Sequence, residues 1–147
     1  MARPLPSPNA ETLPFWEGCR RGELLYQACG DCGRRQFYPR ARCSICHSDR
    51  LDWARSGGLG TIHSFTIVHR APSPAFRADV PYVIALVDLD EGFRMMMNVR
   101  RCPPEAVAIG MRVAVFFEKT EGDTPLPQAA PAGEGGFSIR LYRQQFV

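Results

Sequence analysis

The stretch CGDCGRRQFYPRARCSIC, residues 29–46, decides the fold of the first part of this 147-residue chain. Its four cysteines, Cys29, Cys32, Cys43 and Cys46, follow the spacing Cys-x2-Cys-x10-Cys-x2-Cys. Each Cys-x2-Cys pair can form a tight turn that points two thiolates at one ion, and two such turns complete a tetrahedral four-sulfur shell. Because protein atoms then fill every coordination position, the spacing predicts a structural metal rather than a catalytic one.

Zinc is the metal that we expect in this shell, with iron in a rubredoxin-like site as the alternative, since four thiolates accept either ion. A disulfide framework is not favoured, because residues 1–9 contain no apolar signal segment and we expect a cytoplasmic protein. Cys19 and Cys102 lie outside the spacing. We interpret both as ordinary small thiols, buried or half-buried.

The composition restricts the class of protein. A chain of this length can build one sizeable core. No apolar run approaches the roughly 20 residues that a membrane span needs, so no membrane association is expected. The formal net charge of +3 is modest, and Lys119 is the only lysine among 18 basic residues. Arginine binds phosphate and carboxylate through a planar fork, but such a bias can equally reflect codon composition.

The sequence divides into three parts: an N-terminal helical segment (1–22), a zinc ribbon (23–56) and a barrel (57–147). In the first part, residues 12–21 are expected to form a short helix that Thr12 caps and Gly22 ends. In the ribbon, short strands are expected at 24–28, 36–38 and 51–55 around the cysteine turns. The sequence Ser56-Gly57-Gly58 marks the next boundary.

Beyond this boundary the sequence alternates apolar and polar residues, which is typical of half-buried strands. Strands are expected at 61–69, 82–90, 93–100, 112–119 and 137–143, with a helical turn at 103–108 and a mobile loop at 121–136. In the third strand, Phe93, Met95, Met97 and Val99 are expected to face the core. Five short strands with a helical turn before the fourth fit a closed barrel of the OB type. The predicted fold is therefore mainly β, with a five-stranded OB-fold barrel after the ribbon.

Several short motifs together resemble one known family. It comprises acyl-CoA-associated OB-fold proteins with an N-terminal rubredoxin-like zinc ribbon, formerly catalogued as a domain of unknown function. Besides the four cysteines, the matching stretches are Phe15-Trp16-Glu17-Gly18, Gly22-Glu23-Leu24, Pro39-Arg40, His69-Arg70-Ala71-Pro72, Pro74-Ala75-Phe76, Pro81-Tyr82-Val83, Asp90-Glu91-Gly92 and Ile109-Gly110. They cover roughly residues 12–127. Two departures are His47, where glycine is usual, and the run Met95-Met96-Met97.

The resemblance implies an accessory role in lipid metabolism. Members of the family are found beside thiolase-like enzymes, and some form complexes with such thiolases or with related aldolases. The chain is therefore expected to be a non-catalytic, zinc-containing subunit that binds acyl-CoA, a thiolase-like partner enzyme, or both. A homo-oligomer or a hetero-oligomer is compatible with this role.

The segment from Val68 to Tyr82 is a candidate for the ligand or partner surface. Its prolines stiffen the chain and prevent regular strand pairing. An exposed aromatic ring and nearby arginines on such a loop can hold the adenine ring and the phosphates of CoA. We therefore expect Arg70, Phe76 and Tyr82 to border an acyl-CoA or partner surface. The alternative is that the prolines only shape the loop and Phe76 closes one end of the barrel.

A second function of a different class stays open, because OB barrels and zinc ribbons both bind single-stranded nucleic acid. That function requires stacking aromatics beside a basic groove. The ribbon part does contain four arginines, Arg34, Arg35, Arg40 and Arg42. The barrel part is electrically balanced, and its strand aromatics fall mainly on inward positions. A nucleic-acid partner is therefore the less favoured interpretation.

Overall fold

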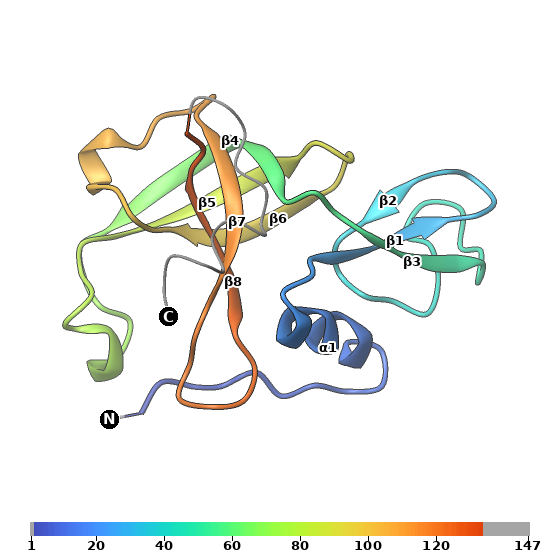
Figure 1. Ribbon diagram of the computed structural model, residues 1–147, viewed down its shortest axis with the longest axis horizontal. Coiled ribbons are helices and arrows are strands. Elements are labelled where there is room, and N and C mark those ends of the chain that lie inside the picture. The colour runs from blue at the N-terminus through green and yellow to red at the C-terminus, as the bar shows by residue number, and fades with distance from the viewer. Residues whose placement is uncertain (1, 134–147) are drawn as a thin grey trace.

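The computed structural model describes residues 2–133, which form one helix and two β-sheets (Figure 1). The regular elements are α1 (Leu13–Arg21), β1 (Leu25–Cys29), β2 (Arg35–Gln36), β3 (Leu51–Arg55), β4 (Leu59–Val68), β5 (Tyr82–Leu89), β6 (Arg94–Val99), β7 (Arg112–Glu118) and β8 (Leu126–Pro131). Two 3-10 turns, η1 (Pro74–Phe76) and η2 (Pro104–Ala106), lie between strands. Within residues 2–133, no helix is long and apolar enough to cross a bilayer.

The helix α1 begins and ends close to the predicted positions, but its first turn is closed differently. Thr12 occupies the N-cap position without a side-chain capping bond. The side chain of Asn9 instead accepts hydrogen bonds from the backbone N–H groups of Glu11 and Thr12. Gly22 ends the helix in the left-handed region, with φ 75°, a conformation that glycine adopts at little cost.

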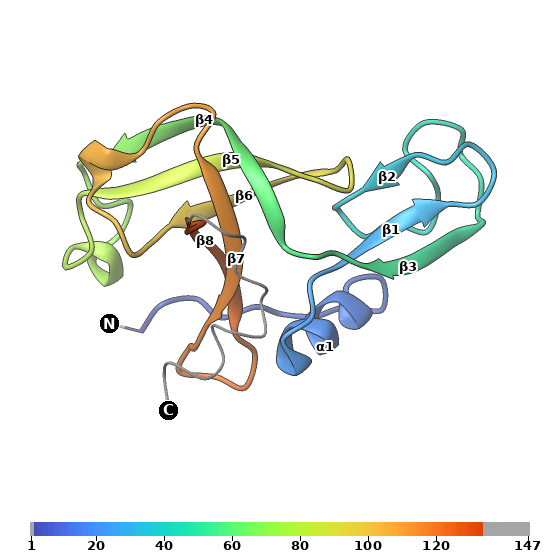
Figure 2. The ribbon, with the colours of Figure 1, turned by 45° about the horizontal axis from the view of Figure 1, so that its top comes forward.

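The ribbon part forms a three-stranded antiparallel sheet in the order β2-β1-β3. The second sheet closes into a barrel in the order β4-β5-β6-β8-β7, which confirms the predicted OB-type architecture. Figure 2 shows the barrel and the ribbon sheet side by side, joined by the chain between β3 and β4.

The strand that closes the barrel is β8, at residues 126–131, within the stretch predicted to be a loop. That prediction was wrong for these residues, and the predicted strand at 137–143 lies outside the described residues. β8 pairs antiparallel with β7 over six registered positions, from Val113 opposite Pro131 to Glu118 opposite Leu126. Its composition of proline and alanine conceals this pairing, because both residues are uncommon in strands.

Proline has no backbone N–H to donate. The two prolines of β8 are tolerated because their backbone nitrogens point away from β7. Alternate residues of a strand offer their backbone groups to the same neighbouring strand. The carbonyl of Ala129 accepts from Arg100 N–H beyond the end of β6, so Pro127 and Pro131 also face the β6 side. There, β6 and β8 are in register only at Val99 and Ala129. The missing N–H groups therefore cost no bond to β7.

The barrel core consists of alternate residues of β5, β6 and β7, with single residues from β4 and β8. Phe93, Met95, Met97 and Val99 are all buried, as their spacing predicted. The barrel core continues into the ribbon through aromatic contacts: the ring of Phe93 stacks on that of Tyr26, with centroids 4.6 Å apart. The two parts therefore share one hydrophobic cluster.

Polar contacts from one hairpin also join the ribbon to the barrel. The carboxylate of Glu91, in the turn between β5 and β6, accepts from the hydroxyl of Ser56 at 2.6 Å and from Gly57 N–H at 3.0 Å. The guanidinium of Arg35 in β2 donates to the Glu91 backbone carbonyl. One turn of the barrel thus holds both the linker and the edge of the ribbon sheet.

Candidate metal centre and ligand pocket

The four cysteines of the two turns converge on one point. Their Sγ atoms all lie within 4.8 Å of one another. The Cys29 and Cys46 sulfurs are 3.5 Å apart, and those of Cys32 and Cys43 are 3.6 Å apart. Four sulfurs at about 2.3 Å from a tetrahedral zinc ion would lie about 3.8 Å from one another. The cluster therefore has the size and donor set of a four-coordinate metal site.

Backbone N–H groups in the turns point at the sulfurs. Cys32 N–H lies 3.5 Å from the sulfur of Cys29, and Ile45 N–H lies 3.4 Å from that of Cys43. The N–H of Cys46, with help from that of Ile45, lowers the pKa of Cys43 to about 6. These dipoles favour the thiolate, which is the form that binds a metal.

The two turns have the same backbone design, but they use different residues at the position after the second cysteine. Gly33 N–H donates to the carbonyl of Cys29, and His47 N–H donates to that of Cys43. Both residues have positive φ, 74° for Gly33 and 62° for His47. The histidine is therefore held in a left-handed conformation that costs a non-glycine residue about 1–2 kcal/mol.

Substitutions at these two positions should change the free energy of unfolding in opposite directions. We expect His47→Gly to stabilise the metal-loaded protein by up to about 1 kcal/mol, the relief of strain being partly offset by the greater freedom of glycine in the unfolded chain. Gly33→Ala should destabilise it by about 1 kcal/mol. Urea denaturation midpoints of the two variants measure both effects. A His47→Gly variant less stable than the wild type would mean that the imidazole contributes a contact worth more than the strain.

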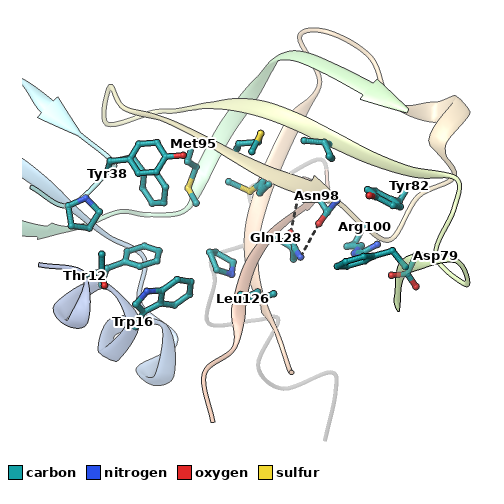
Figure 3. A pocket seen from close by; sticks show the side chains of 18 residues that line it. Thr12, Trp16, Tyr38, Asp79, Tyr82, Met95, Asn98, Arg100, Leu126 and Gln128 are labelled. Atoms are coloured by element: carbon teal, nitrogen blue, oxygen red, sulfur yellow. Dashed lines mark hydrogen bonds between the residues drawn. The ribbon is translucent and has the colours of Figure 1, made fainter. Parts of the chain in front are cut away.

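One pocket among the described residues has a volume of about 460 Å³ and is bounded by α1, the ribbon, η1 and the strands β5, β6 and β8. Its walls are mostly apolar. The lining residues are Thr12, Phe15, Trp16, Phe37, Tyr38, Pro39, Phe76, Asp79, Tyr82, Ile84, Met95, Met96, Met97, Asn98, Arg100, Leu126, Pro127 and Gln128. Figure 3 shows Trp16, Thr12 and Tyr38 at one end and Tyr82, Arg100 and Asp79 at the other. The pocket thus has an aromatic end and a polar end.

Side-chain hydrogen bonds fix the middle of this pocket. The side-chain carbonyl of Gln128 accepts from the backbone N–H of Asn98 at 2.9 Å, and its amide donates to Glu118 at 3.0 Å (Figure 3 shows the Asn98 contacts). At the polar end, Arg100 Nε lies 3.5 Å from the carboxylate of Glu118. That Nε is buried without a hydrogen bond among the described residues. Arg100 therefore brings a guanidinium to the polar end of a largely apolar cavity, with its Nε buried beside Glu118.

The structure brings two of the three predicted surface residues together. Phe76 and Tyr82 both line the pocket, whereas Arg70 is exposed outside its lining. The guanidinium of Arg3 lies 5.4 Å from the centre of the Phe76 ring and pairs with Asp79. Sequence reasoning gave no site role to Arg100, Gln128 or Trp16, because they come from three segments that meet only when the barrel closes. The resemblance did mark Trp16, but without a role.

The remaining cysteines lie apart from the metal cluster. Cys19 is buried in the shared core, and burial raises the pKa of its thiol to about 12. Cys102 is half-buried, and burial raises its pKa as well. Neither thiol is poised as a thiolate, in agreement with their interpretation as ordinary small side chains.

Comparison with known proteins identifies the family. Residues 16–52 match the model of the ChsH2 rubredoxin-like zinc ribbon domain, and residues 53–118 match that of the ChsH2 C-terminal OB-fold domain. The chain is 32% identical over 111 residues to a DUF35 domain-containing scaffold protein of Methanothermobacter thermautotrophicus, covering 74% of this chain and 83% of that protein. This chain belongs to the ChsH2/DUF35 family.

Family members of known structure share the fold described above. The Ltp2-ChsH2(DUF35) aldolase contains a chain that superposes on this one with a TM-score of 0.77 and 31% identity, covering 86% of this chain and 98% of that chain. A DUF35-family protein from Sulfolobus solfataricus superposes with a TM-score of 0.61 and 14% identity, covering 84% of this chain and 86% of that chain. The second likeness concerns the fold alone.

Two larger relatives carry enzyme names. The 3-oxo-4,17-pregnadiene-20-carboxyl-CoA hydratase alpha subunit of Mycobacterium tuberculosis is 41% identical over 112 residues, which cover 76% of this chain. A probable enoyl-CoA hydratase alpha subunit of Thermomonospora curvata is 32% identical over 130 residues, 88% of this chain. The ChsH2/DUF35 chain described here spans only 35% and 40% of these two subunits, respectively.

Proposed function

We propose that this protein is a non-catalytic accessory subunit that binds acyl-CoA and a thiolase-like partner enzyme. The observation that carries the proposal is the apolar pocket beside Phe76 and Tyr82. Its volume of about 460 Å³ lies in the range of small-molecule sites, about 300–1,000 Å³. We infer that Arg70, which lies on the same proline-rich segment but outside the pocket, contacts the CoA phosphates.

The names of the relatives support a role beside another enzyme. Two are alpha subunits of hydratases, one solved structure is an aldolase of two named components, and the archaeal relatives are scaffold proteins. The names of the two hydratase subunits and of the two-component aldolase thus describe parts of larger assemblies. We infer the same kind of role for this chain from its likeness to these proteins.

Zinc is the metal that we propose for the four-thiolate cluster. It would be held by Cys29, Cys32, Cys43 and Cys46, and its task there is structural, because all four ligands come from the protein. It fixes the two turns and the segment between them, which cannot bury enough apolar surface by itself. Iron remains the alternative ion for the same ligands.

Binding of octanoyl-CoA by the complex with a thiolase-like enzyme tests this function. The enzyme to co-express is one encoded next to this gene, and the two proteins are expected to co-purify. We expect Arg70→Ala to weaken octanoyl-CoA binding by about tenfold, the loss of one charged hydrogen bond to phosphate. Isothermal titration of the purified complex measures the change.

Arg34→Ala is the matched control, because it removes an exposed arginine from the ribbon. An unchanged affinity for Arg34→Ala with a weakened affinity for Arg70→Ala supports a specific phosphate contact. Equal weakening in both variants, together with tight binding of single-stranded DNA that falls steeply with salt, would favour the nucleic-acid function instead.

A further inference from the structure

The pocket owes its existence to a gap between two barrel strands. β6 and β8 are in register only at Val99 and Ala129, and they separate from there toward Met95 and Leu126. Pro127 lacks the N–H that a continued ladder would use, and the side chain of Gln128 takes up the N–H of Asn98 instead. We call this gap, formed by residues 95–98 and 126–128, the β6–β8 seam.

We propose that the β6–β8 seam holds the acyl body of a thioester ligand, with its carbonyl oxygen at Arg100 and its hydrocarbon end toward Trp16. This inference rests on the proposed function and adds the position and direction of the acyl group. It places the CoA nucleotide outside the pocket, on the side of Arg70. The seam thereby separates recognition of the acyl body from recognition of the phosphates.

The apolar lining fits a hydrocarbon of variable shape. Met95, Met96 and Met97 all line the pocket, although successive side chains of a strand point to opposite faces. Met95 and Met97 are buried and Met96 is exposed, so the pocket runs along the edge of β6. Unbranched thioether side chains adapt to irregular ligands. The aromatic rings of Phe15 and Trp16, 5.0 Å apart in an edge-to-face arrangement, close the far end.

The charges at the polar end favour a neutral oxygen acceptor over an anion. Arg100 is paired with Glu118, with 3.5 Å between Nε and the carboxylate. Asp79 is paired with Arg3 at 2.5 Å. The pocket end is therefore nearly neutral. The Nε of Arg100 is buried beside Glu118, so a ligand would meet the guanidinium at its terminal nitrogens. A thioester carbonyl supplies an acceptor for the guanidinium without adding a charge, whereas a phosphate or carboxylate would lie beside two acids.

A fluorescence titration with a ligand that has no nucleotide tests the seam directly. The chain has two tryptophans, and Trp16 lines the pocket whereas Trp53 does not. In a Trp53→Phe background, Trp16 is the only reporter. We expect the octanoyl thioester of N-acetylcysteamine to change its emission in a saturable way. The absence of saturable binding would overturn the inference and would instead suit a seam that receives an apolar segment of a partner protein.

Two substitutions of an exposed apolar residue by glutamate test whether the ligand binds in the seam or elsewhere on the surface. Met96 and Ile109 are both exposed, 59% and 70%, and only Met96 lines the pocket. We expect Met96→Glu to weaken binding of the octanoyl thioester at least about tenfold, because it puts a charge into the apolar seam. Ile109→Glu should leave the affinity unchanged. Equal affinities for the two variants would contradict the proposal.

A matched ligand pair tests the direction of the acyl group. S-octyl-N-acetylcysteamine has the same chain length and the same N-acetyl group, but it lacks the thioester carbonyl oxygen. The wild type should prefer the thioester by about tenfold, as expected for one hydrogen bond to a charged donor. In Arg100→Met the preference should vanish while the thioether affinity stays the same. A wild type that binds both ligands equally would overturn the assignment of Arg100.

Octanoyl-CoA, titrated in parallel, separates this inference from the proposed function. If octanoyl-CoA binds the complex and the N-acetylcysteamine thioester does not bind the chain, the seam is wrong and the function stands. If octanoyl-CoA and the N-acetylcysteamine thioester bind with equal affinity, the seam holds the acyl group and the proposed contact between Arg70 and the CoA phosphates is wrong. Metal content and far-ultraviolet circular dichroism of each variant show that the fold is intact.

Discussion

Replacing Cys43 with serine should release the metal and unfold the ribbon. Cys43 is buried and lies 3.6 Å from the sulfur of Cys32, so the hydroxyl of a serine would leave the ion with three thiolates. Structural zinc contributes about 10–16 kcal/mol in small zinc-dependent folds, and the loss of one ligand removes much of it. We expect the wild type to contain one zinc per chain by mass spectrometry of the metal, and Cys43→Ser to contain little or none.

Limited digestion with trypsin reads out the fold of the ribbon in the same experiment. Arg34 and Arg42 lie on the chain between the cysteine turns and should become rapid cleavage sites once the metal is lost. Cys102→Ser is the matched control, because it makes the same chemical change at a half-buried thiol outside the cluster. A Cys43→Ser protein that keeps its zinc and resists trypsin like the wild type would contradict the four-ligand site. A wild type that carries iron would identify the alternative ion.

Gly60→Ala should destabilise the barrel by about 1–3 kcal/mol, the usual cost of forcing an extra group into a packed core. A Cβ at Gly60 would lie 2.7 Å from the backbone oxygen of Asp88 and 2.8 Å from Cγ1 of Val87. The backbone has little room to move away, because β4 is paired on both sides at this position, with Leu89 of β5 and Val113 of β7. The close approach of the strands at this point needs a residue without a side chain.

Gly57→Ala provides the comparison for this measurement. Gly57 lies three residues earlier in the same stretch, and the nearest heavy atom to its Cβ would be a Glu91 carboxylate oxygen at 3.9 Å. We expect its free energy of unfolding, measured by urea denaturation, to stay within about 0.5 kcal/mol of that of the wild type. Equal midpoints for the two variants, with unchanged denaturant slopes, would show that β4 can shift at Gly60.

Local patterns predicted most of the fold because they act over short distances. The cysteine spacing places four sulfurs through two turns of a few residues each, and the period of two in residues 93–99 fixes which side chains enter the core. The strand β8 was not predicted because its residues have a low propensity for strands, and its pairing with β7 is what stabilises it. Pro127 and Pro131 argue against a strand until the direction of their absent N–H groups is known.

The pocket was less predictable than the fold, because most of its residues meet only through contacts between segments that are distant in the sequence. Phe76 and Tyr82 belong to a segment that the prolines and the resemblance had singled out. Arg100 and Gln128 owe their roles to the divergence of β6 from β8, which no local pattern encodes. Trp16 reaches the pocket only because α1 packs beside the barrel.

Phe37, Tyr38 and Pro39 form one wall of the pocket, and they lie on the chain between the two pairs of cysteines. We expect this wall to lose its place when the sulfurs are no longer bridged by an ion. Oxidation of a single thiol, or a chelator that never enters the cavity, would therefore abolish ligand binding without touching any residue that contacts the ligand. In a cell, the supply of metal would then set how much of this protein is competent to bind.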